Sequence, residues 1–224
     1  MTDQPTATDT GPDMASLLCS RLCHDLLSPV GALSNGLELL ADEDDPEMRQ
    51  RCLELLEQSA KISADKLKFF RLAFGAAGGF GDNVAVEEPK ALIDALVGDN
   101  DRIDVRWALS GESLPKPAVK VLLNFAQIAL DALVRGGTLE IGAESTGDAS
   151  EIAVRAAGQR IAFDDTIGKA LDGSLPPADL TSRTAPAAMI AQLASNCGGG
   201  LQYHRSDEAL VLGAVLPRPA GMIG

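Results

Sequence analysis

Residues 20–32 read Ser-Arg-Leu-Cys-His-Asp-Leu-Leu-Ser-Pro-Val-Gly-Ala, and they lie inside a helical pattern that runs from about Met14 to Ala41. An α-helix turns about 100° per residue, so this pattern carries one sustained apolar stripe. Its members all fall within about 40° of Leu26: they are Leu22, Val30, Leu33, Leu37 and Leu40. A stripe of this kind is typical of a helix that packs in a bundle.

His24 lies about 160° from Leu26 on the same helix, so we expect its side chain to point away from the packed face. The residues around it on that outward face are small or polar: Ser20, Ser28, Gly31 and Asn35. The solvated face of an acidic protein more often carries Glu and Lys. This face lacks bulky side chains, so another protein surface could approach it closely, and the imidazole lies at its centre.

Pro29 lies inside the expected helix, five residues after His24. Proline has no N–H, so the carbonyl of Asp25 loses its helical partner and the helix bends there. A proline inside a helix costs about 3 kcal/mol. A cost of this size beside an exposed histidine indicates a functional reason.

His24 and Asp25 have the chemistry of a nucleophile and its orienting carboxylate. Neutral imidazole is a good nucleophile near pH 7, and attack by one ring nitrogen on a phosphoryl group requires the other nitrogen to hold the proton. Asp25 is placed to orient the ring or to accept its proton. A lone exposed histidine is usually only a surface residue. Here the cleared face, the proline and the helical hairpin described next together favour a function.

A second helical pattern runs from about Glu47 to Phe74, after an acidic turn, and the two helices form an αα-hairpin. The second helix carries two apolar stripes. One stripe contains Met48, Cys52, Leu55, Ile62 and Phe69, and the other contains Leu53, Leu56, Ala60, Leu67, Phe70 and Phe74. A single hairpin cannot bury both, so either two copies form a four-helix bundle or the second stripe packs on the rest of the chain. We favour the homodimer.

The remainder of the chain predicts an α+β domain with a mostly antiparallel sheet and helices on one face. Strand patterns occur at 103–109, 138–143, 151–157, 201–204 and 209–216, and helical patterns at 117–135 and 186–196. The predicted organisation is a disordered tail at 1–13, the hairpin at 14–76, a glycine-rich linker at 77–82, the α+β domain at 83–217 and a tail at 218–224.

The charge and composition of the chain indicate which partners it is unsuited to bind and in which compartment it works. The net charge of −13 disfavours nucleic acid and anionic membrane surfaces as partners. No stretch approaches the roughly 20 apolar residues that span a bilayer, and the polar N-terminus lacks the basic region of a signal peptide. The four cysteines form no C-x-x-C pair, which favours reduced thiols over zinc or disulfides. We therefore expect a cytoplasmic protein.

The segment His24-Asp25-Leu26-Leu27-Ser28-Pro29 resembles the H-box of sensor histidine kinases. In that family a His, an acidic residue and a Pro five residues on open the first helix of the dimerisation and histidine-phosphotransfer domain. The order of hairpin, linker and α+β domain is also similar, with the second domain resembling the kinase ATP-binding domain, the Bergerat or GHKL-like α/β sandwich. The resemblance covers nearly all of residues 14–217.

The second domain departs from the kinases at the motifs that bind ATP. The N-box, Asn-Leu-x-x-Asn-Ala, keeps its first residue as Asn124 but has Ile128 in place of the Mg²⁺ ligand. Isoleucine cannot ligate a hard cation. The Asp-x-Gly-x-Gly box corresponds to residues 156–160, which lack the Asp and end in Arg160, and residues 182–186 offer no glycine-rich nest for phosphates. We expect a domain that keeps the fold and does not bind ATP.

A histidine-bearing hairpin with a degenerate ATP domain is similar to the ChpT-type histidine phosphotransferases of alphaproteobacteria. The resemblance implies a homodimer that takes a phosphoryl group onto His24 from the receiver domain of a CckA-like hybrid kinase. It then passes the group to the receivers of response regulators, the cell-cycle regulator CtrA and the proteolysis adaptor CpdR. We expect no cofactor or metal on this chain, with Mg²⁺ held by the partner receiver. The expected catalytic residues are His24 and Asp25, and the expected partner contacts are Ser20, Leu27, Ser28, Gly31 and Asn35.

Two other functions stay open. An ATP-using histidine kinase is disfavoured by the missing Mg²⁺ ligand and the missing adenine-binding Asp. A dimeric scaffold or inhibitor that binds receiver domains without carrying phosphate is disfavoured by the H-box.

Overall fold

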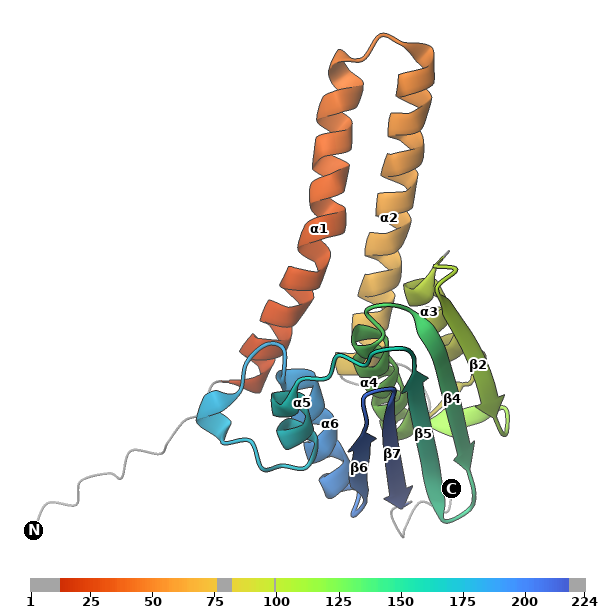
Figure 1. Ribbon diagram of the computed structural model, residues 1–224, viewed down its shortest axis with the longest axis vertical. Coiled ribbons are helices and arrows are strands. Elements are labelled where there is room, and N and C mark those ends of the chain that lie inside the picture. Colours follow the sequence, from red (N-terminus) through yellow and green to blue (C-terminus); the bar gives the residue numbers. More distant parts are fainter. Residues whose placement is uncertain (1–12, 76–81, 99, 218–224) are drawn as a thin grey trace, which may run out of the picture.

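The computed structural model describes residues 13–75, 82–98 and 100–217 (Figure 1). Two long antiparallel helices, α1 (Met14–Asp42) and α2 (Pro46–Phe74), form a hairpin that projects from an α+β domain. Of the tails predicted at 1–13 and 218–224 and the linker predicted at 77–82, only Asp13 and Asp82 are among the described residues. The bounds of α1 and α2 confirm the hairpin predicted from the apolar stripes, and they lie within a few residues of those expected.

Side chains that precede or follow the two helices satisfy their ends. The carboxylates of Asp13 and Asp45 accept hydrogen bonds from the first turns of α1 and α2, as N-caps do. Arg49 donates from Nη1 to the carbonyls of Leu40 and Glu43, at 3.0 and 2.7 Å, where α1 ends. The last carbonyls of a helix lack partners within it, so this arginine closes the hairpin tip.

Small residues of α1 face α2 and leave room there for a larger side chain of α2. The buried residues of α1 are Pro29 and Gly36, and a Cβ built on Gly36 would lie only 2.9 Å from Leu56 Cδ2. Larger members of the predicted stripe consequently lie at the side of the hairpin, where Val30 and Leu37 stay 50% and 59% exposed. A single chain thus leaves part of this stripe uncovered.

The second domain contains a five-stranded sheet in the order β2-β4-β5-β7-β6. The strands are β2 (Ile103–Leu109), β4 (Gly137–Ser145), β5 (Ala149–Ala157), β6 (Gly200–Arg205) and β7 (Ala209–Pro217). Strand β2 pairs parallel to β4, and the other pairs are antiparallel. A short ribbon joins β1 (Asn83–Ala85) and β3 (Ser113–Pro115). The predicted α+β fold class, a helical hairpin followed by an α/β sandwich, is confirmed.

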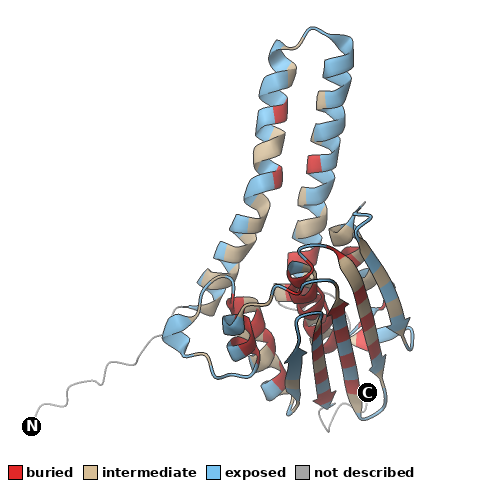
Figure 2. Ribbon diagram, in the orientation of Figure 1, coloured by how far each residue is buried: buried red, intermediate tan, exposed pale blue. Residues whose placement is uncertain are grey.

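The helices of the second domain pack on one face of this sheet (Figure 1). They are α3 (Glu87–Val97), α4 (Lys116–Ala132), α5 (Asp165–Leu171) and α6 (Ala185–Asn196), with a 3₁₀ turn η1 at Pro177–Asp179. Helix α4 is buried along most of its length and contacts β4, β5 and β7. The strands alternate between buried and exposed residues, so the second face of the sheet is open (Figure 2). The sequence patterns predict neither α3 nor α5, because both are short and bury their apolar residues through tertiary contacts.

The base of α2 is part of the core of the second domain. Phe69, Phe70 and Ala73 are buried in the same hydrophobic cluster as α4 and the sheet, and Phe70 stacks on Phe74 with ring centroids 5.3 Å apart. Packing on the rest of the chain therefore buries the apolar residues at the lower end of α2. Higher on the helix, Leu53 and Leu67 stay exposed.

Truncation of the buried Phe69 side chain tests whether α2 packs into the second domain. Its side chain is 1% exposed, so we expect Phe69→Ala to lower the free energy of unfolding by about 3–5 kcal/mol through lost burial and the cavity left behind. Urea denaturation at one fixed protein concentration measures the change. The control is the neighbouring exposed Lys68→Ala, which should cost no more than about 0.5 kcal/mol. Equal midpoints for the two variants would contradict the docking.

Candidate functional site

His24 lies on the outside of α1, and its side chain is 83% exposed. Its Nδ1 is 3.2 Å from Oδ1 of Asp25. When Nδ1 carries the ring proton it donates to this carboxylate, and Nε2 keeps its lone pair toward solvent. His24 and Asp25, the two residues predicted to be catalytic, are therefore in contact, and the contact uses Nδ1 of the ring.

Asp25 contacts three different groups. Its Oδ1 faces His24, its Oδ2 accepts a hydrogen bond from Arg21 Nε at 2.7 Å, and its backbone carbonyl accepts one from Lys66 Nζ at 2.8 Å. The Asp25 side chain is only 18% exposed, although His24 beside it is open to solvent. The carboxylate is therefore held from the side of the hairpin that meets the second domain.

Lys66 takes the carbonyl that Pro29 leaves without a helical partner. The sequence predicts this orphaned carbonyl at Asp25, and the structure shows that α2 supplies its donor. A buried carbonyl without a partner costs free energy, so the ammonium offsets part of the cost of the proline. Sequence reasoning missed Lys66, because its partner lies on another helix.

Arg21 connects this site to the second domain. Its Nη2 is 3.3 Å from Oδ2 of Asp131, the penultimate residue of α4, and Asp131 Oδ1 accepts from Gln127 Nε2 at 2.8 Å. Partial burial opposes the charge of Arg21, but the hydrogen bond and charge of Asp25, together with Asp131, outweigh it and raise the pKa of the guanidinium. A cavity of about 320 Å³ lies at this junction, lined by Arg21, Asp25, Lys66, Gln127 and Asp131 among others.

The five expected partner contacts lie along the same side of α1 as His24. Helical geometry places four of them within about 40° of the histidine and Leu27 about 60° away. Leu27 is 75% exposed, and Ser20, Ser28 and Asn35 are also exposed. A Cβ on Gly31 would meet no described atom within 4 Å, so no contact in the part of the chain that the structure describes requires a glycine there. Their role in binding a partner stays a prediction.

The residues compared above with the ATP-binding motifs of the kinases are packed or hydrogen-bonded within the domain. Asn124 is buried, and its side-chain amide donates to the carbonyl of Lys120 at 2.8 Å. Ile128, one turn further along α4, is also buried. In the stretch 182–186, Thr184 is buried, and its hydroxyl accepts from the backbone N–H of Thr181 at 3.0 Å.

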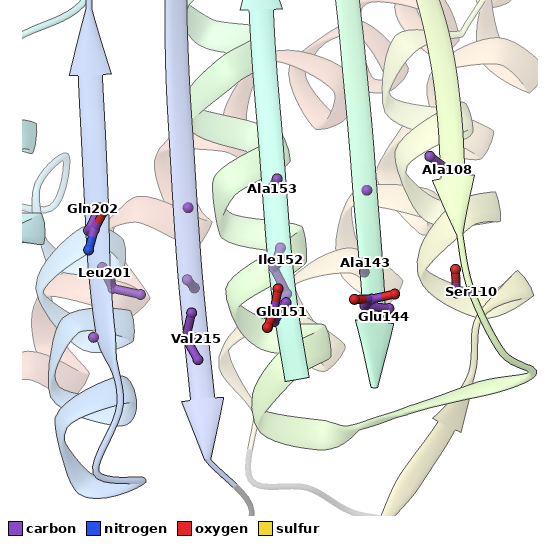
Figure 3. A pocket seen from close by; sticks show the side chains of 14 residues that line it. Ala108, Ser110, Ala143, Glu144, Glu151, Ile152, Ala153, Leu201, Gln202 and Val215 are labelled. Carbon is purple, nitrogen blue, oxygen red and sulfur yellow. The ribbon is translucent and has the colours of Figure 1, made fainter. Parts of the chain in front are cut away.

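The open face of the sheet carries a broad groove of about 480 Å³ (Figure 3). Small residues from four adjacent strands form its floor: Ala108, Gly142, Ala153 and Gly213. Glu144 and Glu151 lie directly opposite each other on β4 and β5 at one side of it. The groove lies on the sheet face that the helices do not cover, so it does not belong to the histidine site.

The described part of the chain contains neither a cluster of metal-ligating side chains nor a helix that could cross a membrane. In residues 13–75, 82–98 and 100–217, no three side chains of His, Cys, Asp or Glu come together as a metal site would require. Within those same ranges, no helix combines the length and the apolar character that crossing a bilayer demands.

Comparison with known proteins places both parts of the chain beside phosphotransferases. Residues 86–209 match the family model of the histidine phosphotransferase C-terminal domain. The protein phosphotransferase ChpT of Brucella abortus (strain 2308) is 31% identical over 206 residues, which cover 90% of this chain and 95% of that protein. A bacterial phosphotransferase of known structure superposes with a TM-score of 0.78 at 28% identity, over 95% of this chain and 100% of the other. These last two matches extend over the hairpin and the second domain.

The contact between Lys66 and Asp25 can be tested by a double-mutant cycle. We expect Lys66→Met to lower the free energy of unfolding by about 1 kcal/mol, because the Asp25 carbonyl loses its donor. In a Pro29→Ala background the residue 29 N–H can bond to that carbonyl, so the same Lys66→Met change should cost about 0.5–1 kcal/mol less. Urea denaturation of the four proteins measures both costs. Lys61→Met, exposed on the same helix, is the control, and strictly additive effects would refute the interpretation.

Proposed function

Because this chain belongs to the family of ChpT-like histidine phosphotransferases, we propose that it relays a phosphoryl group between receiver domains of a bacterial phosphorelay through phospho-His24. The observation that carries the proposal is the exposed imidazole whose Nδ1 faces a partly buried carboxylate, which leaves Nε2 open to a partner protein. The protein would act in the cytoplasm.

The transfer step exchanges one bond to phosphorus for another. The Nε2 of His24 attacks the phosphorus of a receiver phospho-aspartate in line, the P–N bond forms, and the P–O bond breaks to release the aspartate carboxylate. Nδ1 keeps its proton throughout, and Asp25 balances the positive charge that develops on the ring. In the second half, the aspartate of another receiver attacks the phosphorus, and neutral imidazole is regenerated. The Mg²⁺ that neutralises charge on the phosphoryl group would be held by the acidic pocket of the receiver.

We assign partner docking rather than ATP chemistry to the second domain. The support is the buried Asn124 and Ile128 on the face of α4 where the kinases hold nucleotide and metal, and the absence of the adenine-binding Asp from residues 156–160. The donor would be the receiver of a CckA-like hybrid kinase, and the acceptors would be CtrA-like and CpdR-like response regulators. Ser20, Leu27, Ser28, Gly31 and Asn35 would contact these receivers around His24.

The exposed apolar rows of the hairpin support a homodimer. On α1, Val30 and Leu37 lie about 160–180° from Arg21, the residue that contacts α4. On α2, Leu53 and Leu67 lie about 160° from Phe69, which packs into the second domain. Both rows therefore face away from the second domain, and all four side chains are between 49% and 59% exposed. Two copies pairing through these rows would form a four-helix bundle.

Phosphate on His24 is the direct test of function. After incubation with a ³²P-phosphorylated receiver domain, the chain should carry an acid-labile, base-stable label, and His24→Gln should abolish it. His204→Gln, which changes the other histidine, is the control and should keep the label. Binding of the receiver without any label would instead support a scaffold or inhibitor. Label from ATP in the absence of a receiver would support a kinase.

Two equally exposed leucines on α1 provide a matched test of the proposed dimer interface. Leu37 and Leu39 are exposed to the same degree, 59% and 60%, but Leu39 lies on the same side of the helix as Arg21. Leu37→Asp should raise the dimer dissociation constant by about 100-fold or more, because a buried unpaired carboxylate costs several kcal/mol and each 1.4 kcal/mol is tenfold. Leu39→Asp should leave the dimer intact. Sedimentation equilibrium measures both, and identical constants would exclude this interface.

A further inference from the structure

The junction between the hairpin and the second domain contains five polar or charged side chains, of which the transfer step described above uses only Asp25. Arg21 and Asp25 come from α1, Lys66 from α2, and Gln127 and Asp131 from α4, and all five line the cavity at this junction. The inference drawn from them rests on the proposed role of His24 in phosphotransfer. It concerns how the second domain acts on the chemistry of the histidine.

Four side chains from two parts of the molecule form a continuous chain of polar contacts. Asp131 Oδ2 is 3.3 Å from Arg21 Nη2, Arg21 Nε donates to Asp25 Oδ2 at 2.7 Å, and Asp25 Oδ1 is 3.2 Å from His24 Nδ1. Each carboxylate uses one oxygen for Arg21 and the other for a second partner, since Asp131 Oδ1 accepts from Gln127. The chain leads from α4 to the ring of His24.

The pair of Arg21 and Asp25 alone would hold the carboxylate weakly. Ion pairs at i,i+4 on a helix contribute little, and the order with the cation on the N-terminal side is the less favourable one. Here both side chains are only 18% exposed, and a second carboxylate holds the same guanidinium from outside the helix. Networks of several charges keep their geometry better than isolated surface pairs.

Asp131 also stands where a carboxylate is intrinsically unfavourable. It lies in the last turn of α4, and the negative end of a helix disfavours an anion. Arg21 is the cation that offsets this. Helix α4 is buried along most of its length, and α2 is anchored in the same core through Phe69 and Phe70, so Asp131 is presented from a rigid element.

We propose that Asp131 is a positioning residue for phosphotransfer: through Arg21 it fixes the Asp25 carboxylate against Nδ1 of His24, so that the ring proton stays on Nδ1 and Nε2 is free to attack. The helix that in the kinases carries the N-box thereby acts on the phosphorylated histidine itself. The second domain contributes to the reactivity of His24 and not only to the docking of partners.

The spectroscopic test uses the ring tautomer of neutral His24, which ¹⁵N chemical shifts report. In the unmodified protein we expect the tautomer with the proton on Nδ1 to predominate. Asp131→Asn removes the charge and keeps the shape, and it should increase the tautomer with the proton on Nε2. His204, the other histidine, gives an internal reference whose unchanged shifts show that the domain is folded.

The kinetic test uses phosphoramidate, a small phosphoryl donor that needs no docking surface. Asp131→Asn should slow phosphorylation of His24 by roughly 5- to 10-fold, a small part of what a positioned acid–base group can contribute. Asp131→Glu should recover most of the rate. Combined with Arg21→Gln, Asp131→Asn should add little further loss, because both changes break the same chain of contacts. The control is Asp104→Asn, which breaks an ion pair with Arg106 on the open face of the sheet and should change neither readout.

Several results would overturn the proposal. One is an Asp131→Asn protein with an unchanged tautomer and an unchanged phosphoramidate rate, even if its transfer from a receiver falls, since Asp131 would then be a docking residue. Another is full additivity of the Asp131 and Arg21 changes. If His24 of the unmodified protein takes no phosphate from either donor, the proposed function fails, whereas the tautomer measurement still decides whether Asp131 positions the ring.

Discussion

Burial of the lower end of α2 in the second domain is the constraint on which the rest of this molecule depends. Phe69, Phe70 and Ala73 belong to the same hydrophobic cluster as α4 and the sheet, so the hairpin base and the domain share one core. This packing brings α1 within reach of α4 and places Asp131 beside Arg21. Without it, the Asp25 carboxylate would keep contacts only within its own helix, and a surface ion pair of this kind holds geometry weakly.

The site around His24 contains a carbonyl that has lost its hydrogen bond within α1 and receives one from α2 instead. Pro29 removes the donor for the Asp25 carbonyl, and Lys66 replaces it from the facing helix. The same residue, Asp25, contacts the imidazole of His24 with one carboxylate oxygen and Arg21 with the other. One aspartate thus links the carbonyl freed by Pro29, the contact between the two helices and the imidazole of His24. His24 itself stays exposed, as the proposed transfer to and from another protein requires.

The faces of α4 have different partners in this structure. The face of α4 that carries Asn124 and Ile128 is packed inside the domain, whereas Gln127 and Asp131 of the same helix point toward the hairpin. A run of polar and apolar residues at helical spacing predicts that α4 exists. It does not say which of its faces meets the sheet and which meets another helix, because both faces contain residues that can be buried.

The sequence by itself determined the long helices, the α+β class of the second domain, the outward position of His24 with Asp25 beside it, and the loss of a helical partner at the Asp25 carbonyl. These follow from periodicity, from the missing N–H of proline and from residue chemistry, which are local properties. Only the tertiary structure decided that small residues of α1 face α2, that α3 and α5 form, and that Lys66 and Asp131 reach the site. Lys66 and Asp131 lie 41 and 110 residues from their partners, and such contacts depend on how the core packs rather than on any local pattern.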